Sequence, residues 1–320
     1  MFDSQKSLIK KMVFIDGLPR SGKSSICNVI TSLKNSESLE FCYTLEQLLP
    51  GIASRKININ FAKAFINKHF DEIAYNKFLG RNSNFRPKDW TGIPNFSFPN
   101  IYKKRLKSKE GKKIIRDLKR TKNFFPFMSH NIMPNINYFY QLGLNSKIIS
   151  LYRNPFSVVY SLFNKRVGNR TEKDSRVFTI LERASNGRLY PWYVGKDYKK
   201  WFRFNEMEKS AFIVLKLLKL SIKKHKYFKK NKKILTISYE DYLLNTNQVL
   251  QRICNFIKTK KTPITPKFLR REKLPITGRK IIKIDNKRIK KIIKTKISKQ
   301  LFKSLIELEN KYSKNIYNLR

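Results

Sequence analysis

Acidic residues are scarce in this chain. Its 320 residues include 22 Asp and Glu against 70 Lys and Arg, which gives a formal net charge of +48. Such an imbalance is typical of proteins that bind polyanions, such as nucleic acids, anionic glycans or membrane surfaces. An AT-rich genome would give the same bias, because its codons also favour the Asn, Ile, Phe and Tyr that are used heavily here. The charge can therefore reflect either a polyanion-binding function or the base composition of the genome. The hydrophobic content of 41% indicates a folded chain.

Cysteine and histidine are also rare, with three residues of each. Cys27, Cys42 and Cys254 have no metal-ligand spacing, so we expect reduced thiols, a cytoplasmic location and no bound metal. We expect no secretory signal, and no apolar run reaches the length of a membrane span. The apolar residues 211–222 are too few for a span and are followed by a lysine run, so they predict a buried helix.

Two glycines stand where a phosphate-binding turn needs them. Residues 12–15 favour a buried strand, and the apolar residues that follow the turn favour a helix. Gly17, Gly22, Lys23 and Ser24 fit the spacing GxxxxGK[ST] of a nucleotide P-loop. Glycines let the backbone approach a ligand closely, and the N-terminus of a helix favours an anion. The stretch predicts a phosphate site, although an ordinary turn with a solvated lysine has the same spacing.

Short apolar segments alternate with helical patterns along most of the chain. Further strands are predicted near residue 39 and at 124–128, 147–152 and 234–239, and helices in part of 57–78 and at 135–142, 155–163, 206–228 and 246–257. Strands separated by helices form parallel sheets that are covered on both faces. We therefore predict an α/β fold of three layers, with a central parallel sheet of about five strands flanked by helices, as in P-loop NTPases.

Polar and basic stretches interrupt this alternation. Residues 80–96 interleave basic and aromatic side chains with Pro, Gly and Asn, and they predict a long loop, as do residues 259–278. We predict one α/β domain over residues 1–285, with an irregular insertion at 167–200 over one end of the sheet. Residues 286–320 are expected to form a basic helical tail that is dispensable for ligand binding.

Arg153 and His130 each follow a predicted strand. Arg153 stands two residues before Pro155, and proline at the first helical position favours the start of a helix. Ligands of parallel α/β sheets bind beyond the C-terminal strand ends, so we expect the glycine-rich turn, His130 and Arg153 to meet there. A neutral imidazole at this place can accept a hydroxyl proton near pH 7. His69 and His225 lie in polar or lysine-rich stretches, and we expect both to be solvated.

Four segments resemble those of sulfotransferases that use 3′-phosphoadenosine 5′-phosphosulfate (PAPS). GLPRSGKSS resembles the family's 5′-phosphosulfate loop, and SLYRNPFSVVYSLF resembles its 3′-phosphate motif, which has a serine eight residues after the arginine. ISYEDYLLNTNQVLQRICNFI resembles the YEDL segment and its following helix, and SHNIMP resembles the strand end that carries the catalytic histidine. The resemblance covers residues 12–258, with unmatched stretches at 52–123 and 167–200. It implies a fold of the sulfotransferase type.

The resemblance also implies roles for individual residues. Arg153 and Ser161 would bind the 3′-phosphate of the donor, and Arg20 would bridge the leaving oxygen. The implied donor-binding residues are Arg20, Ser21, Gly22, Lys23, Ser24, Ser25, Arg153, Ser161 and Tyr239, the last of which would contact adenine. The implied catalytic residues are His130, Arg20 and Lys23. Some related enzymes use a glutamate as the base, and Glu46 is the corresponding candidate here.

The chain departs from the family's pattern at three places. Lys23 and Ser24 stand where the family usually has two threonines. Ser25 replaces an aromatic residue that often stacks on adenine. The family's C-terminal Arg-Lys-Gly element has two competing candidates, residues 270–271 and residues 278–280.

The expected function is the transfer of a sulfuryl group from PAPS to a hydroxyl or amine of an acceptor. The basic composition and the aromatic-basic loop suit an anionic or carbohydrate acceptor, while a lipid or a small phenol stays open as an alternative, and no metal is required. The first alternative is a kinase that uses ATP–Mg, which would need an acidic magnesium ligand at a neighbouring strand end; only Glu240 with Asp241 could serve. The second alternative is a basic nucleic-acid-binding protein, which would explain the charge but not the order of the phosphate motifs. With PAPS and its product PAP (adenosine 3′,5′-bisphosphate) as ligands, we expect no nucleic-acid partner.

Overall fold

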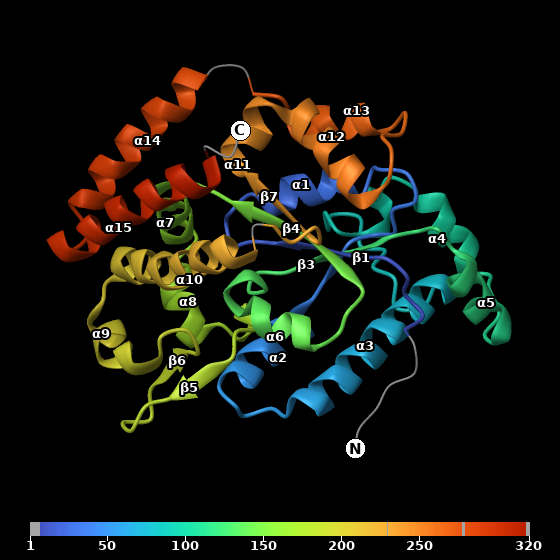
Figure 1. Ribbon diagram of the computed structural model, residues 1–320, viewed down its shortest axis with the longest axis horizontal. Coiled ribbons are helices and arrows are strands. Elements are labelled where there is room, and N and C mark those ends of the chain that lie inside the picture. The colour runs from blue at the N-terminus through green and yellow to red at the C-terminus, as the bar shows by residue number, and fades with distance from the viewer. Residues whose placement is uncertain (1–6, 229, 277–278, 318–320) are drawn as a thin grey trace.

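A five-stranded parallel sheet lies at the centre of the structure, a computed structural model (Figure 1). The structure describes residues 7–228, 230–276 and 279–317, with backbone alone over 279–285. The strands are β1 (Met12–Asp16), β2 (Glu40–Phe41), β3 (Phe125–Met128), β4 (Ser146–Tyr152) and β7 (Ile234–Ser238), in the order β2–β3–β1–β4–β7. All four pairings are parallel. The predicted α/β fold with a parallel sheet of about five strands is therefore confirmed.

Strand β1 lies in the middle of the sheet, between β3 and β4. All five of its residues are buried, and successive side chains of a strand point to opposite faces. Phe14 joins the hydrophobic cluster on one face, whereas Val13 and Ile15 join the cluster on the other. Ile15 is paired with Met128, the last residue of β3. The C-terminal ends of three neighbouring strands therefore open onto one edge of the sheet.

Helices cover both faces of the sheet. The face that holds Phe14 packs against α2 (Tyr43–Ala53), α3 (Ile59–Leu79) and α6 (Ile136–Gln141), and the other face packs against α1 (Lys23–Ile30) and α12 (Thr246–Ile257). A third hydrophobic cluster beside the sheet joins α7 (Pro155–Asn164) and α10 (Glu206–Phe228). The short helices α4 (Pro99–Arg105), α5 (Lys112–Arg120) and α11 (Tyr239–Leu244) lie in the connections. Among the described residues, no helix combines the length and the apolar composition that a membrane crossing requires.

The predicted insertion is more regular than its sequence indicates. It contains α8 (Val167–Lys173), a hairpin of β5 (Leu181–Arg183) with β6 (Leu189–Pro191), and the start of α9 (Tyr198–Arg203). Gly187 in the hairpin turn has φ +80°, a conformation that glycine adopts without strain. Strands of three residues are too short to show alternation, which is why the prediction of irregular structure was wrong here. Helix α8 packs against α7 and α10.

The predicted loop at residues 259–278 also contains a helix, α13 (Thr265–Arg271). Pro266 lies in its first turn, where the missing N–H of proline costs no hydrogen bond. Asn28 of α1 donates a hydrogen bond of 2.7 Å to Glu272, directly after α13. The loop prediction is therefore wrong for this part, because a proline that starts a helix has the same composition signal as one that interrupts it.

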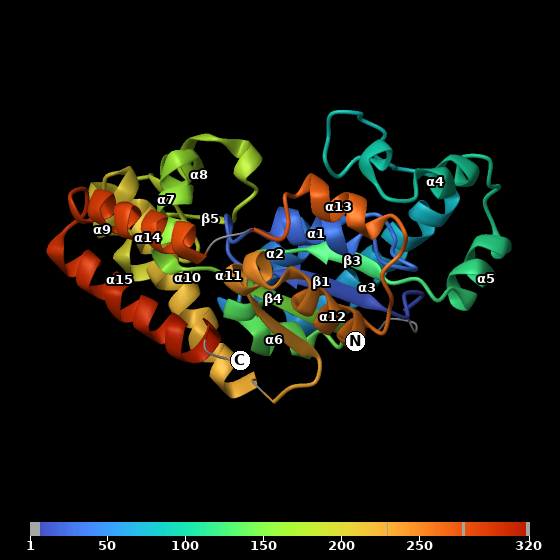
Figure 2. The same cartoon turned by 90° about the horizontal axis from the view of Figure 1, so that it is seen from above.

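The predicted C-terminal tail forms two helices that pack onto the rest of the protein (Figure 2). Helices α14 (Arg279–Lys294) and α15 (Lys299–Tyr312) contact α7, and α15 also contacts α10. Ile293 and Leu305 are completely buried in the cluster that contains these helices. The rings of Phe302 and Phe156 lie 5.6 Å apart. The tail is helical, as its apolar spacing predicts, and its first helix begins before residue 286.

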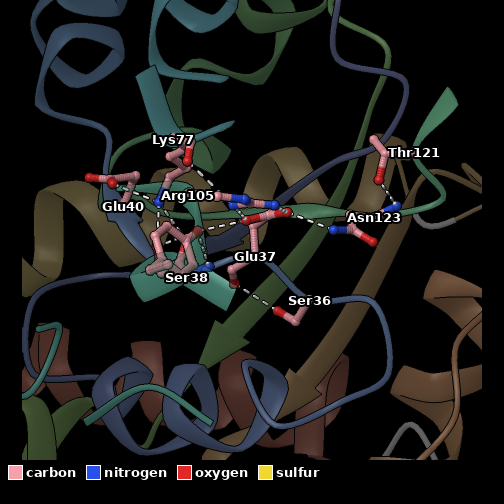
Figure 3. A network of polar contacts seen from close by, with 9 residues as sticks. Ser36, Glu37, Ser38, Glu40, Lys77, Arg105, Thr121 and Asn123 are labelled. Carbon is pink, nitrogen blue, oxygen red and sulfur yellow. Dashed lines mark hydrogen bonds and ion pairs between the residues drawn. The ribbon is translucent and has the colours of Figure 1, made fainter. Parts of the chain in front are cut away.

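A buried polar network fixes the chain between α3 and β3 to the edge of the sheet (Figure 3). The carboxylate of Glu37 accepts two hydrogen bonds from the guanidinium of Arg105, at 2.7 and 2.8 Å. It also accepts one of 2.6 Å from the hydroxyl of Tyr102. Burial raises the pKa of Glu37, but its hydrogen-bond donors outweigh this effect and the net pKa is lowered. Lys77 forms a neighbouring ion pair of 2.8 Å with Glu40, so α3 and α4 are held at β2 by paired charges.

Candidate functional site

The turn between β1 and α1 has a backbone suited to a phosphate. Gly22 has φ +97°, and a Cβ at this position would lie 2.2 Å from the ring of Tyr239. A Cβ at Gly17 would lie 2.3 Å from the carbonyl oxygen of Leu151. The hydroxyl of Ser21 is buried and makes no hydrogen bond within the described part of the chain. A buried hydroxyl without a partner, next to the N-terminus of a helix, fits an anionic ligand.

The side chain of Lys23 lies within this turn and is only 4% exposed. Its ammonium group donates to the carbonyl oxygens of Gly17 and Leu18, the latter at 2.7 Å. Burial lowers the pKa of Lys23 from 10.5 to about 8, although Asp16 and Glu46 act in the opposite direction. The ammonium group therefore stabilises the turn while it is charged, and it loses its proton at a lower pH than an ordinary lysine.

Two arginines and a serine meet beside the turn. Arg20 adopts φ +69°, and its Nε donates a hydrogen bond of 3.0 Å to the hydroxyl of Ser161 on α7. Arg153 donates one of 3.1 Å to the carbonyl oxygen of Arg20, and its guanidinium lies 4.9 Å from the centre of the Tyr239 ring. Neither arginine forms an ion pair with a carboxylate of the described residues. Their positive charges are therefore available to an anion that binds from outside.

The start of α7 holds Arg153 in place. The side chain of Asn154 caps the helix, because its Oδ1 accepts hydrogen bonds from the backbone N–H groups of Phe156 and Ser157. The N–H of Asn154 itself donates to the buried carboxylate of Glu240 at 2.9 Å. Both the cap and this hydrogen bond fix the backbone directly after Arg153.

His130 is paired with Glu46 at the end of β3. Its Nδ1 lies 2.7 Å from Oε1 of Glu46, and the two side chains are 21% and 13% exposed. A carboxylate can only accept a hydrogen bond, so Nδ1 is the nitrogen that carries the proton in this pair, and in a neutral imidazole Nε2 is then the one with the lone pair. The two residues that the sequence offered as alternative bases therefore belong to one pair.

Asp16 is a site residue that the sequence reasoning missed. It is completely buried at the end of β1, and its carboxylate accepts hydrogen bonds from the hydroxyl of Ser129 and from the N–H groups of Ile132 and Met133, at 2.8, 3.1 and 2.9 Å. These bonds fix the turn that carries His130. A carboxylate at the end of an otherwise apolar strand was the signal that could have identified it.

A cavity of about 210 Å³ opens beside the His130–Glu46 pair. Tyr43 of α2 and Arg170 of α8 also line it, so the segment predicted as an insertion closes one side of this cavity. The ring of Tyr43 packs against that of Phe178 at 4.9 Å, and both side chains are exposed. The cavity therefore combines an imidazole, a cation and aromatic surface.

A larger cavity, of about 380 Å³, opens beside Arg153. Ser157 of α7 and Tyr239 of α11 line it together with Asn286 and Arg288 of α14. The structure thus brings one cavity to each of the two strand ends that flank the glycine-rich turn. The contribution of α14 was not predicted from the sequence.

The other predicted site residues have these positions. Ser24 is exposed in the first turn of α1, and the hydroxyl of Ser25 lies 3.4 Å from that of Tyr242. Residues 270–271, one candidate for the C-terminal phosphate contact, are exposed on α13 and line neither of the two cavities. The second candidate includes Gly278, which lies outside the described residues.

The remaining histidines are less exposed than predicted. His225 is 3% exposed on α10, and its ring lies 6.0 Å from that of Tyr152. His69 is half-buried, and its Nε2 lies 3.0 Å from the hydroxyl of Thr44. The prediction of solvated side chains is wrong for His225, because the lysines around it occupy the other face of an amphipathic helix. The structure places no group of three or more potential metal ligands among the residues that it describes.

The fold and the site together define an α/β protein with a glycine-rich, P-loop-like turn at the centre of a parallel sheet. The sequence model of the sulfotransferase domain matches residues 10–272, which is more than half of the chain. The chain therefore belongs to the sulfotransferase domain family, as its motifs indicate.

Several solved sulfotransferase structures resemble the chain distantly. The sulfotransferase domain of the olefin synthase from Synechococcus PCC 7002 has 14% identity and a TM-score of 0.48, over 98% of each chain. The mouse sulfotransferase SULT7A1, solved in complex with PAP, has 12% identity and a TM-score of 0.42, over 99% of this chain and 87% of that one. No match was found among curated protein sequences. At these identities the family assignment rests on the domain match.

Proposed function

We propose that the protein is a PAPS-dependent sulfotransferase that transfers a sulfuryl group to a hydroxyl or amine of an acceptor. The observation that carries this proposal is the meeting of Arg20, Arg153 and Ser161 at one side of the glycine-rich turn. Guanidinium groups without carboxylate partners and a serine hydroxyl suit a second phosphate beside the one in the turn. PAPS carries such a phosphate at its 3′ position, and ATP does not.

In this proposal the turn and the start of α1 bind the 5′-phosphosulfate. The residues concerned are Arg20, Ser21, Gly22, Lys23, Ser24 and Ser25. The buried hydroxyl of Ser21 and the close approach of Tyr239 to Gly22 support this assignment, and the ring of Tyr239 would contact adenine. PAPS supplies the activated sulfuryl group. Arg20 and Lys23 would stabilise the negative charge that develops on the leaving phosphate.

His130 is the proposed general base. With Nδ1 bonded to Glu46, Nε2 can accept the proton of the acceptor hydroxyl. The acceptor oxygen forms a bond to sulfur while the bond from sulfur to the 5′-phosphate oxygen breaks, and the proton passes to Nε2. Glu46 would orient the imidazole and stabilise its positive charge after the transfer. These steps need only positioned side chains and the helix N-terminus.

A carbohydrate is the proposed acceptor class. The cavity beside His130 has aromatic surface from Tyr43 and a cation from Arg170. Tyr43 continues into a chain of ring contacts, because it packs against Phe178 on one side and Phe41 on the other, at 4.9 and 5.5 Å. Aromatic side chains with polar groups nearby suit the mixed apolar and hydroxylated faces of sugars.

The kinase alternative lacks a suitable magnesium ligand at the end of β7. Both carboxylate oxygens of Glu240 are engaged, one by the N–H of Asn154 and the other by the hydroxyl of Tyr312. Asp241 accepts a hydrogen bond of 2.6 Å from Asn245 and pairs with Arg252 at 3.4 Å. These contacts favour the sulfotransferase over a kinase that uses ATP–Mg.

Thermal unfolding with different nucleotides tests the proposed function. We expect PAP to stabilise the protein by about 2.7 kcal/mol at 100 times its dissociation constant, as for any ligand that binds only the native state. ATP–Mg at the same concentration should stabilise it much less, because ATP has no phosphate for Arg153. Equal stabilisation by ATP that depends on magnesium would instead support a kinase.

The lowered pKa of Lys23 predicts a pH dependence of donor binding. An anion in the turn favours the charged ammonium group, so binding above pH 8 must be accompanied by proton uptake. With a pKa of about 8 for Lys23, only about one molecule in ten carries the charged ammonium group at pH 9. The affinity for PAP at pH 9 should therefore be about tenfold lower than the affinity at a pH where Lys23 is fully charged. Titration calorimetry in buffers of different ionisation enthalpy would measure both the affinity and the proton uptake.

The matched variants are Lys23→Arg and Lys23→Met. A guanidinium stays protonated and a thioether does not titrate, so both variants should lose the proton uptake and the pH dependence between pH 7 and 9. If either variant keeps the wild-type slope, another group is responsible for it.

A further inference from the structure

Basic residues are concentrated in residues 99–122, the segment that contains α4 and α5. This α4–α5 segment has 11 Lys and Arg against two acidic residues among its 24 residues. The other 296 residues of the chain (320 − 24) carry 59 Lys and Arg (70 − 11), so the basic fraction falls from nearly one in two to one in five. The base composition of a genome acts along the whole gene, so it does not account for this local excess.

The cations of α5 lie on one face of the helix. Ile114 and Leu118 are buried in the cluster that contains α3, and they mark the inner face. At about 100° per residue, the opposite face holds five exposed cations within an arc of about 120°. These cations are Lys112, Lys113, Arg116, Lys119 and Arg120. Every positive charge of α5 therefore points away from the protein, and these five residues form its cationic face.

The α4–α5 segment is fixed to the rest of the protein. The N–H of Gly111 donates a hydrogen bond of 3.1 Å to the hydroxyl of Tyr75 on α3. Arg105 of α4 is paired with Glu37, and its guanidinium lies 4.1 Å from the centre of the Phe78 ring. Helix α5 lies at one end of the molecule and α15 at the other in both views (Figure 1 and Figure 2). The cationic face is therefore held in a defined orientation at the periphery of the fold.

The charges of this face do not contribute to the stability of α5. Lys112 and Lys113 occupy the first turn, where the helix dipole disfavours cations, and the N-cap residue Gly111 supplies no side-chain hydrogen bond. Arg116 lies four residues from both Lys112 and Arg120, a spacing at which like charges destabilise a helix. An anionic surface opposite the cationic face would relieve this repulsion.

The two acidic residues of the segment do not neutralise this face. Glu110 pairs with Arg81, outside the segment, at 3.1 Å. Asp117 lies to the side of the helix, about 100° from the centre of the cationic face. No cation of this face forms an ion pair with a carboxylate of the residues that the structure describes. The face therefore has a field of one sign, which favours an extended anionic partner.

Exposed aliphatic side chains distinguish between the classes of anionic partner. Leu106, directly after α4, is 57% exposed, and Ile101 is 41% exposed. Such side chains insert among lipid head groups, whereas phosphates and sulfates offer them no apolar contact. The aromatic residue of the segment, Tyr102, is buried, so it offers no stacking surface to unpaired bases. Eight of the ten exposed cations are lysines, whose point charges suit a diffuse anionic surface.

We propose that the α4–α5 segment is a peripheral attachment surface for a membrane that contains anionic lipids. The cationic face attracts the head groups, and Leu106 and Ile101 enter among them. Because α5 buries its own apolar face against α3, the attachment is mainly electrostatic and reversible. No residue of the segment lines the cavity beside His130 or the cavity beside Arg153, so this inference goes beyond the proposed function and does not depend on it.

Sedimentation of the full chain with vesicles tests the inference. Vesicles of phosphatidylcholine alone are compared with vesicles of equal parts phosphatidylcholine and phosphatidylglycerol, at about 0.15 M and about 1 M salt. We expect binding to the anionic vesicles at the lower salt concentration and little binding under the other conditions. The combined replacements Lys112→Gln, Arg116→Gln and Arg120→Gln should weaken this binding at least tenfold. Circular dichroism checks the fold, and the affinity of this variant for PAP should equal that of the wild type.

The matched control replaces Lys299, Lys303 and Lys311, three exposed lysines of α15, with glutamine. It removes the same charge at the opposite end of the molecule, and its vesicle binding should stay within about twofold of the wild type. Leu106→Ser should weaken binding to the anionic vesicles about threefold or more, because it removes apolar surface from the contact. Its binding to heparin, an anionic glycan without a lipid phase, should not change.

Three results would overturn the inference. Equal losses for the two triple variants would show that only the net charge of the protein matters. Equal binding to both kinds of vesicle would exclude recognition of anionic lipid. Unchanged vesicle binding by Leu106→Ser, with an equally large loss of heparin or duplex DNA binding in the α5 variant, would assign the surface to a soluble polyanion.

Discussion

Replacement of His130 with alanine or glutamine should slow sulfuryl transfer by about a hundredfold or more, the usual effect of removing a positioned general base. The reason is geometric, because His130 is the imidazole that lines the smaller cavity and its Nδ1 is already bonded to Glu46. PAP binding should stay close to that of the wild type, since His130 lies at the end of β3 and Arg153 at the end of β4. The measurements are turnover with a known acceptor and PAP affinity by calorimetry.

The companion variant Glu46→Gln tests whether Glu46 is itself the general base or only orients His130. It keeps the shape of the side chain but removes the charge that favours a protonated imidazole, so we expect a smaller loss of turnover and a shifted pH profile. If both His130 variants turn over at nearly the wild-type rate while Glu46→Gln does not, Glu46 is the base and the assignment of His130 is wrong.

Replacement of Arg153 with alanine should weaken donor binding by about 2–4 kcal/mol, roughly 30- to 1,000-fold, because a charge-assisted contact to a phosphate is lost. Folding should change far less. Arg153 is half-buried at the edge of a cavity, and its side chain donates one hydrogen bond within the described part of the chain, to the carbonyl oxygen of Arg20. Calorimetry with PAP and urea unfolding would measure the two effects separately.

Lys165→Ala is the control for this variant, because Lys165 is an exposed cation directly after the same helix. It lowers the net charge by the same amount, so any general electrostatic effect on an anionic nucleotide should be equal in both variants. Normal PAP binding by Arg153→Ala would show that the 3′-phosphate motif has been assigned to the wrong residues.

Much of the fold follows from local patterns in the sequence. Strand β1, the glycine-rich turn and α1 have an apolar run, two glycines and an apolar helix in direct succession, and the structure has each where it was predicted. Pro155 marked the start of α7 for the same reason. Helix α13 and the β5–β6 hairpin were missed, because a segment of three to seven residues carries too little periodicity to outweigh its polar composition.

The candidate site was less predictable than the fold. Its residues could be named one at a time from the ends of strands, but their partners are far away in the sequence. Glu46 and His130 are 84 residues apart, and Asn154 and Glu309 are 155 residues apart. No local pattern in one sequence links such pairs. The role of Asp16 was missed because a single carboxylate after an apolar strand also fits a solvated turn.

The position of α14 and α15 has a consequence for synthesis of the protein. Their apolar residues cover a cluster that belongs to α7 and α10. Helix α10 ends at Phe228, and Ile289 of α14, which packs against the cluster, follows 61 residues later (289 − 228). Domains fold as units during synthesis, so an apolar surface stays exposed to solvent until the segment that packs on it has been synthesised. The nascent chain therefore carries an exposed apolar face on α7 and α10 until its last helices emerge. A chaperone that binds apolar segments would have its target there, and a chain that stalls before residue 300 would keep that target exposed.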